Sequence, residues 1–304
     1  MGPTAAGKTD LAIDLAQRFP VEIISVDSAL VYRGMDIGTA KPDAETLKCY
    51  PHHLVNILDP TDSYSVGAFR TDALRLMEEI SSRGKVPLLV GGTMLYFKGL
   101  EQGLADLPSA DINIRAKLER EAETYGLAHL HQRLSAIDPI SAARIHINDP
   151  QRLQRALEVF EITGKSLTEL TAVKPNKLPY QIIKVIVSPF DRATLHQRIS
   201  QRYHNMIDNG FLLEAQRLFN REDCHSDLPA IRAVGYRQAW SHFSGEYDQD
   251  IMIDKAIIAT RQMAKRQLTW LRSQPDGVWF DSGNGLPLQD ITNFIIERCP
   301  ELVV

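Results

Sequence analysis

The chain has 304 residues, of which 44% are apolar and 24% charged, and its formal net charge is −4. This composition is typical of a globular protein with room for one large core and a second unit. The longest apolar runs are only as long as a strand, well short of the roughly 20 residues of a membrane-spanning helix. No secretory signal is visible, and the three scattered cysteines disfavour a disulfide framework or a cysteine-based zinc site. We therefore expect a cytoplasmic protein with no membrane partner.

The first chemical motif lies at the beginning of the sequence. GPTAAGKT fits the pattern G-x-x-x-x-G-K-[ST] and comprises Gly2, Pro3, Thr4, Ala5, Ala6, Gly7, Lys8 and Thr9. Glycines allow successive backbone N–H groups to surround an anion, and a helix that follows adds partial positive charge. The motif predicts a phosphate site in which Lys8 contacts the terminal phosphate oxygens and Thr9 binds Mg²⁺. The alternative is a glycine-rich turn that matches by chance, and the motif does not identify the molecule that carries the phosphate.

Strands and helices alternate over the first hundred residues. Apolar residues from Leu11 to Phe19 predict a helix, and Val21–Val26 and Val86–Val90 read as buried strands. This alternation predicts an α/β fold with a doubly wound parallel sheet, whose ligands bind at the carboxyl ends of the strands. Together with the phosphate motif, it favours a P-loop NTPase-like core. Because a buried strand normally precedes a phosphate loop, we expect that the numbered start is truncated or misassigned.

Asp27 and Thr93 each follow one of these strands, so we expect both in one crevice with the phosphate loop. Asp27 is a candidate metal ligand or general base, and its structural alternative is to cap a helix. Thr93, after two glycines, is a candidate clamp for an oxyanion or phosphate, or simply part of a tight turn.

Beyond about residue 108 the pattern changes to short helices without strands. Asn113–Tyr125 reads as a charged helix, Asp149-Pro150 opens a helix that Gly164 closes, and Lys174–Pro179 reads as a return linker. We assign residues 1–108 and 178–304 to a core with C-terminal helices, and residues 109–177 to a helical insertion. The remaining predicted elements are a helix from Ser65 to about Arg83, strands at Gln181–Val187 and Val278–Asp281, and helices at Arg192–Asp208, Phe211–Arg221, Ile231–His242, Ile251–Arg272 and Ile291–Arg298.

Charge is unevenly distributed in the late helices. Seven basic and four acidic residues lie between Ile231 and Arg272, so RNA contact is compatible with the acidic net charge. Trp270 beside the basic residues could stack on a base, although a single tryptophan more often belongs to the core. A solvated helix face is the alternative for the basic residues.

Taken together, these segments resemble the tRNA dimethylallyltransferases of the bacterial type. The resemblance covers nearly the whole chain and rests on the motifs GPTAAGKT (2–9), SVDSALVYRGMDIGTAKP (25–42), PHHL (51–54), PLLVGGTMLYFKGL (87–100), DPQRLQRALEVF (149–160), IRAVGYRQ (231–238) and KRQLTWLR (265–272). Many members carry Gln at the position of Leu30 and Ser at the position of Ala6. The animal and yeast type ends in a Cys/His zinc finger, which this sequence lacks.

The resemblance implies transfer of a dimethylallyl group from dimethylallyl diphosphate to the exocyclic N6 amine of the adenine next to the tRNA anticodon. Asp27 would then be the general base, and Thr93 and Arg115 would orient the amine and the diphosphate. Lys8, Mg²⁺ on Thr9 and the loop amides would neutralise the leaving diphosphate.

The resemblance also implies which segments bind tRNA. They are Asp27, Ser28, Ala29 and Leu30; Gln151, Arg152, Leu153, Gln154 and Arg155; Arg232, Ala233, Val234, Gly235, Tyr236 and Arg237; and Lys265, Arg266, Gln267, Leu268, Thr269, Trp270, Leu271 and Arg272. The insertion would be an arm on the anticodon stem-loop, and we expect a monomer. Three alternatives stay open: a P-loop small-molecule kinase that uses ATP, an adenylate isopentenyltransferase that prenylates a free nucleotide, and a non-catalytic, nucleotide-gated RNA-binding module.

Overall fold

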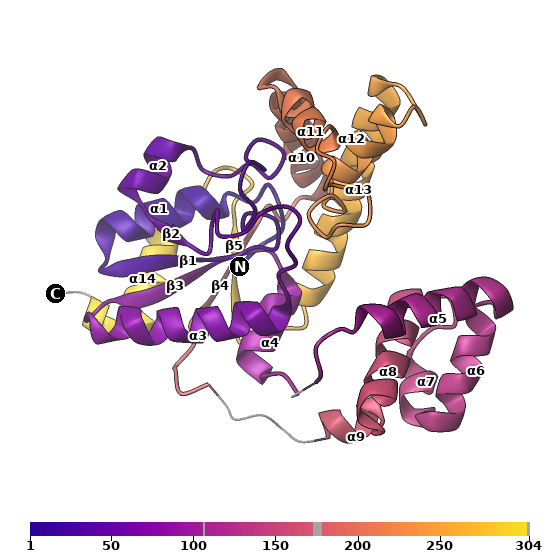
Figure 1. Ribbon diagram of the computed structural model, residues 1–304. Coiled ribbons are helices and arrows are strands. Elements are labelled where there is room, and N and C mark those ends of the chain that lie inside the picture. The colour runs from indigo at the N-terminus through magenta and orange to yellow at the C-terminus, as the bar shows by residue number, and fades with distance from the viewer. Residues whose placement is uncertain (106, 173–177, 303–304) are drawn as a thin grey trace. The chain divides into compact units, whose positions relative to one another are not determined.

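The computed structural model describes residues 1–105, 107–172 and 178–302 (Figure 1). The chain divides into two compact units, Met1–Leu100 with Tyr180–Val304, and Glu101–Pro179. Each unit has its own hydrophobic core. Most of the linker predicted at Lys174–Pro179 lies outside the described residues.

The strands of the first unit pair in parallel, as predicted, but they form two sheets instead of one continuous sheet. In the first sheet β1 (Val21–Val26) lies between β2 (His52–His53) and β3 (Val86–Gly91). In the second, β4 (Lys184–Ser188) pairs with β5 (Gly277–Asp281). Val26 lies opposite Gly91, so the carboxyl ends of β1 and β3 are level and the residues after them start from one edge.

Met1 lies beside β4 and makes the two backbone hydrogen bonds of a parallel strand neighbour. Its amino group donates to the Val185 carbonyl at 2.7 Å, and its carbonyl accepts from the Val187 N–H at 3.0 Å. Gly2 then passes so close to β4 that a Cβ on it would lie 2.3 Å from the Val187 carbonyl oxygen. The phosphate loop therefore starts beside the end of β4 in the second sheet.

Helices cover both faces of the first sheet. α1 (Lys8–Arg18) and α3 (Val66–Ser82) both contact β1 and β3, and they lie on opposite sides of these strands (Figure 1). A cluster of Leu11, Leu15, Val187 and Ile291 fixes α1 against β4 and α14 (Leu288–Arg298). The remaining short elements of this unit are α2 (Ala44–Cys49), α4 (Met94–Gln102) and a 3-10 turn, Pro300–Leu302.

Four helices form a second layer of the first unit: α10 (Arg192–Asp208), α11 (Phe211–Phe219), α12 (Tyr236–Phe243) and α13 (Gln249–Leu271). Their core includes the fully buried ring of Phe211, which contacts Tyr203 and Tyr236 edge-on. The helix predicted over Ile231–His242 is wrong in its first half. Residues 231–235 form turns, and α12 begins only after Gly235, whose φ of 98° is outside the helical range.

The second unit is helical in its described residues. It contains α5 (Ile112–Tyr125), α6 (Leu127–Ile137), α7 (Pro139–Arg144), α8 (Pro150–Thr163) and α9 (Leu167–Thr171). α8 begins and ends as predicted: the Asp149 carboxylate accepts from the Arg152 N–H, and Gly164 terminates the helix in the left-handed conformation. Across the described parts of both units, no helix combines the length and the apolar character needed to cross a membrane.

Candidate active site

The phosphate loop has the backbone of an anion-binding turn. Ala5 has a φ of 60° and Gly7 a φ of 87°, so left-handed residues turn the chain directly before α1. Successive N–H groups in such turns point into one concavity. Gly7, as the N-cap, provides no side-chain hydrogen bond to the first turn of α1. The N–H groups of that turn are therefore available to an anion, and the helix dipole also favours anion binding at this end of α1.

Lys8 stands at the first position of α1 with its ammonium group folded over the loop. The Nζ atom donates to the Pro3 carbonyl at 2.6 Å. Burial, and then the positive charge of Arg202, lowers the pKa of Lys8 to about 8, while Asp27 opposes this shift. A half-buried ammonium with a second cation nearby favours an anion at this position.

Arg202 was not predicted from the sequence, and it is the principal addition to the site. It lies on α10, and its Nη2 donates to the Thr39 carbonyl at 3.1 Å. Burial lowers the pKa of this guanidinium, and Asp27 acts in the opposite direction. Arg198, one turn earlier on α10, donates to the carbonyls of Ser282 and Gly283 at 2.7 and 3.1 Å.

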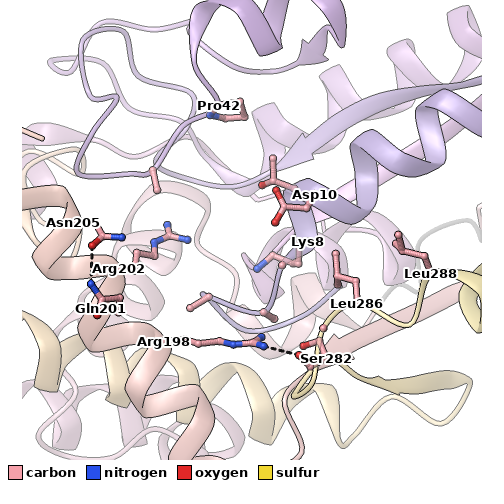
Figure 2. A pocket seen from close by; sticks show the side chains of 16 residues that line it. Lys8, Asp10, Pro42, Arg198, Gln201, Arg202, Asn205, Ser282, Leu286 and Leu288 are labelled. Atoms are coloured by element: carbon pink, nitrogen blue, oxygen red, sulfur yellow. Dashed lines mark hydrogen bonds between the residues drawn. The ribbon is translucent and has the colours of Figure 1, made fainter.

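A cavity of about 780 Å³ brings these groups together. Figure 2 shows Lys8, Arg198 and Arg202 around it, with Leu286 and Leu288 on another side. In the sequence, only the spacing of Arg198 and Arg202, one helical turn apart, indicates this group of cations. On a charged helix such spacing is a weak signal.

The loop whose Thr39 carbonyl accepts the hydrogen bond of Arg202 is fixed by a buried carboxylate. Glu214 on α11 accepts the backbone N–H groups of residues 36, 37 and 38 at 2.8, 2.8 and 2.9 Å. The Tyr236 hydroxyl donates to the same carboxylate at 2.5 Å, and burial, followed by the charge of Glu214, raises the pKa of that phenol. Glu214 thus fixes the loop whose Thr39 carbonyl receives Arg202.

Asp27 directly follows β1 and has one carboxylate oxygen engaged. Its Oδ1 accepts from the N–H groups of Ala29 and Leu30 at 2.8 and 3.3 Å, which closes a turn and not a helix. Its Oδ2 makes no hydrogen bond with the described residues, so one oxygen of a positioned carboxylate is available.

Thr93 is bonded to the segment that Asp27 begins. Its Oγ1 accepts from the Ser28 N–H at 3.0 Å, and its own N–H donates to the Val26 carbonyl at 3.2 Å. Gly91 has to be glycine at this crossing, because a Cβ would lie 2.0 Å from the Val26 carbonyl oxygen. The structure thus joins Asp27 and Thr93 at one strand edge. Neither lines the 780 Å³ cavity, which lies on the side of Lys8 and Thr9.

Arg115 lies in the second unit, on α5, where it pairs with a fully buried carboxylate. Its Nε and Nη2 donate to Glu158 at 2.8 and 3.2 Å, and Arg155 donates to Glu158 at 2.7 Å. Burial opposes ionisation of Glu158, but the hydrogen bonds from Arg115 and Arg155 hold its pKa below the usual range. Among the described residues, Arg115 therefore forms an ion pair with Glu158 inside the second unit.

The segment 151–155, for which tRNA contact was predicted, forms part of α8. The Arg152 side chain is 73% exposed, whereas Leu153 is fully buried in the core of the unit. Gln154 donates to the Arg115 carbonyl and to Glu119, and Arg155 also donates to the Pro108 carbonyl. Arg152 is thus the exposed cation of this segment, and its Nη1 lies 3.2 Å from the Asp149 carboxylate.

The other two predicted tRNA segments are residues 232–237, which form the turns before α12 and its first two residues, and residues 265–272, which form the end of α13 and its C-cap. Tyr236 and Leu271 are buried, and Leu268 packs against the helical core. Lys265 and Arg266 are exposed. The Gln267 side chain instead reaches the phosphate loop.

Oxygen donors suitable for Mg²⁺ lie beside the loop. Thr9 and Asp10, in the first turn of α1, both line the cavity. Among the described residues there is no group of three or more His, Cys, Asp or Glu side chains that could hold a metal ion alone. A hydroxyl and a carboxylate nevertheless fit Mg²⁺, which keeps several waters and shares substrate phosphates with few protein ligands.

The fold and the site define an α/β protein with parallel strands, a glycine-rich turn at a helix N-terminus and a carboxylate at a strand end. The family model of the IPP transferases matches residues 30–274. The chain belongs to this family.

Solved structures extend the similarity to nearly the whole chain. A full-length tRNA isopentenylpyrophosphate transferase from Bacillus halodurans is 39% identical, with 99% of this chain and 95% of that chain covered and a TM-score of 0.72. The tRNA delta(2)-isopentenylpyrophosphate transferase of Staphylococcus epidermidis is 33% identical, with 98% of each chain covered and a TM-score of 0.70. A eukaryotic dimethylallyltransferase acting on tRNA is 26% identical, covers 98% of this chain and 77% of its own, and has a TM-score of 0.82.

Proposed function

We propose that this protein is a tRNA dimethylallyltransferase. It transfers the dimethylallyl group of dimethylallyl diphosphate to the exocyclic N6 amine of the adenine immediately 3′ of the anticodon and releases diphosphate. One observation carries the proposal: a loop with N–H groups and the half-buried cations Lys8 and Arg202 lies near a strand-end carboxylate, Asp27, that has a free oxygen. The family to which the chain belongs, and the activity named for its relatives, support it.

The phosphate loop would hold the leaving group. As the bond between the allylic carbon and the diphosphate oxygen breaks, the electron pair leaves with that oxygen. The loop N–H groups, Lys8 and Arg202 stabilise the charge that develops there. Thr9 and the substrate phosphates would hold Mg²⁺, which neutralises further negative charge when it is bound.

Asp27 would act on the nucleophile. As the new N6–C bond forms, the amine loses a proton, and the free Oδ2 of Asp27 accepts it. The turn at Ala29 and Leu30 fixes the orientation of this carboxylate. Thr93, bonded to the N–H of Ser28, would keep the strand ends in place around the amine.

The adenine has to leave its stack to reach Asp27. Unstacking costs a few kcal/mol, and the cost is smallest in a single-stranded loop such as the anticodon loop. The exposed cations Arg152, Lys265 and Arg266 are suited to phosphate contacts along the stem-loop. We also propose that the protein works as a monomer in the cytoplasm, with the second unit as the arm that binds the anticodon stem.

A single assay distinguishes the alternatives. The protein is incubated with Mg²⁺ and labelled dimethylallyl diphosphate, and either unmodified tRNA or AMP is supplied as acceptor. Label in tRNA alone is expected, and label in AMP would identify an adenylate isopentenyltransferase. Label in neither acceptor, with phosphate transfer from ATP in a parallel reaction, would identify a kinase. RNA binding without any transfer would leave a binding module.

A further inference from the structure

One side chain of α13 spans the gap between the phosphate loop and the end of β3. The Oε1 of Gln267 accepts from the Thr4 N–H at 2.9 Å, and its Nε2 donates to the Gly92 carbonyl at 2.8 Å. The two bonds connect segments that carry different parts of the proposed chemistry. Thr4 belongs to the loop of the leaving group, and Gly92 directly precedes Thr93.

A glutamine is suited to this position because its amide donates and accepts at the same time. Residue 92 has to be small for the amide to reach the backbone, since a Cβ there would lie 2.7 Å from Nε2 of Gln267. An isosteric apolar side chain would leave one N–H and one carbonyl without partners.

The neighbours of Gln267 on α13 have a different environment. Lys265 and Arg266 are exposed, whereas Gln267 is half-buried and turned toward the loop. Membership of the same predicted RNA-binding segment therefore does not imply the same role.

We propose that Gln267 is a positioning residue that fixes the separation between the leaving-group loop and the Asp27–Thr93 end of the site. The inference rests on the proposed function for its kinetic consequence. A displacement of about 1 Å between reacting groups can reduce a rate by about a hundredfold, so a side chain that holds both segments should act on kcat. It should act only weakly on the binding of tRNA.

The experiment compares Gln267→Met with Gln262→Met, the same substitution at an exposed position of the same helix. For Q267M we expect kcat at saturating tRNA and dimethylallyl diphosphate to fall about ten- to a hundredfold, with the Kd for tRNA within about twofold of wild type. Q262M should keep both values. Arg266→Ala should show its loss in the Kd for tRNA instead of in kcat. A Q267M kcat within twofold of wild type, or a loss confined to the tRNA Kd, would overturn the proposal.

A second measurement does not depend on catalysis. The Thr4 amide should exchange its hydrogen slowly in the wild type and in Q262M, and at least tenfold faster in Q267M, while thermal unfolding confirms that all three remain folded. If the wild type transfers no label to tRNA, the proposed function fails, and the exchange rates alone test the bridge. Unchanged Thr4 exchange in Q267M would show that the bridge does not exist in solution.

Discussion

The hydroxyl of Thr93 accepts a hydrogen bond from the backbone N–H of Ser28 at 3.0 Å, which ties the turn after β3 to the residue that follows Asp27. Thr93→Val keeps the shape of the side chain but removes the acceptor. We expect kcat to fall by about tenfold or more, because the Asp27 segment loses one of its anchors. Thr93→Ser, which keeps the hydroxyl, should retain most of the activity. Equal activities of the two variants in single-turnover assays would contradict this role.

Asp27→Asn tests the base directly. The asparagine oxygen can still accept from the N–H groups of Ala29 and Leu30, so the turn should persist while the proton acceptor is lost. We expect kcat to fall by about 10²- to 10⁴-fold, with the affinity for tRNA nearly unchanged. Turnover equal to the wild type would remove Asp27 from this role.

The affinity for the prenyl donor should depend on pH through Lys8. Its pKa is lowered to about 8, so in the free protein the ammonium is charged below this pH and loses its proton above it. The KM for dimethylallyl diphosphate should therefore rise as the pH increases through about 8. Lys8→Met should bind the donor weakly and lack this rise. A flat profile in the wild type would mean that Lys8 does not contact the diphosphate.

Arg266→Ala probes the exposed end of α13 for phosphate contact. Removal of one phosphate contact should weaken tRNA binding and reduce the slope of log K against log salt by about 0.7 to 0.9. Filter-binding titrations between low and moderate salt measure this slope. An unaltered slope would show that the side chain is merely solvated.

Acid should weaken the fold through Glu22. Hydrogen bonds from Arg83, against the opposing effect of burial, and further bonds from His53 and Lys85 lower the pKa of this carboxyl from 4.5 to about 2. Its contribution is fully present above pH 4.5 and is lost as the pH falls toward 2. Glu22→Gln should cost about 1 kcal/mol at pH 7, and the difference from wild type should shrink in acid. Urea unfolding at several pH values measures it.

The parts of the fold that local chemistry marks could be predicted from the sequence. Asp149, Pro150 and Gly164 specify the ends of α8 by capping, and the largely apolar segment Val21–Val26 specifies a buried strand. The helix expected from Ile231 was wrong because Gly235 takes a left-handed backbone that a periodic apolar pattern does not reveal.

The cation group of the site could not be predicted in the same way. Arg202 sits in the middle of a regular charged helix, and only tertiary packing brings it beside Lys8. Gln267 was assigned to tRNA as one member of a segment, while its bonds to Thr4 and Gly92 depend on where α13 crosses the loop. Motifs name the segments of a site, whereas the direction of each side chain follows from the fold.

The hydrogen bonds that the Glu214 carboxylate accepts limit which residues can replace it in related proteins. The described partners of the carboxylate are backbone N–H groups of residues 36–38 and the hydroxyl of Tyr236, all of them donors. Glutamine in its place would turn an amide N–H toward another N–H, and among substitutions in the loop only proline, which has no backbone N–H, would remove one of these donors. Loss of this acid would leave several donors of the loop without their acceptor, so we expect the acid at position 214 and the loop conformation at residues 36–38 to change together among related proteins.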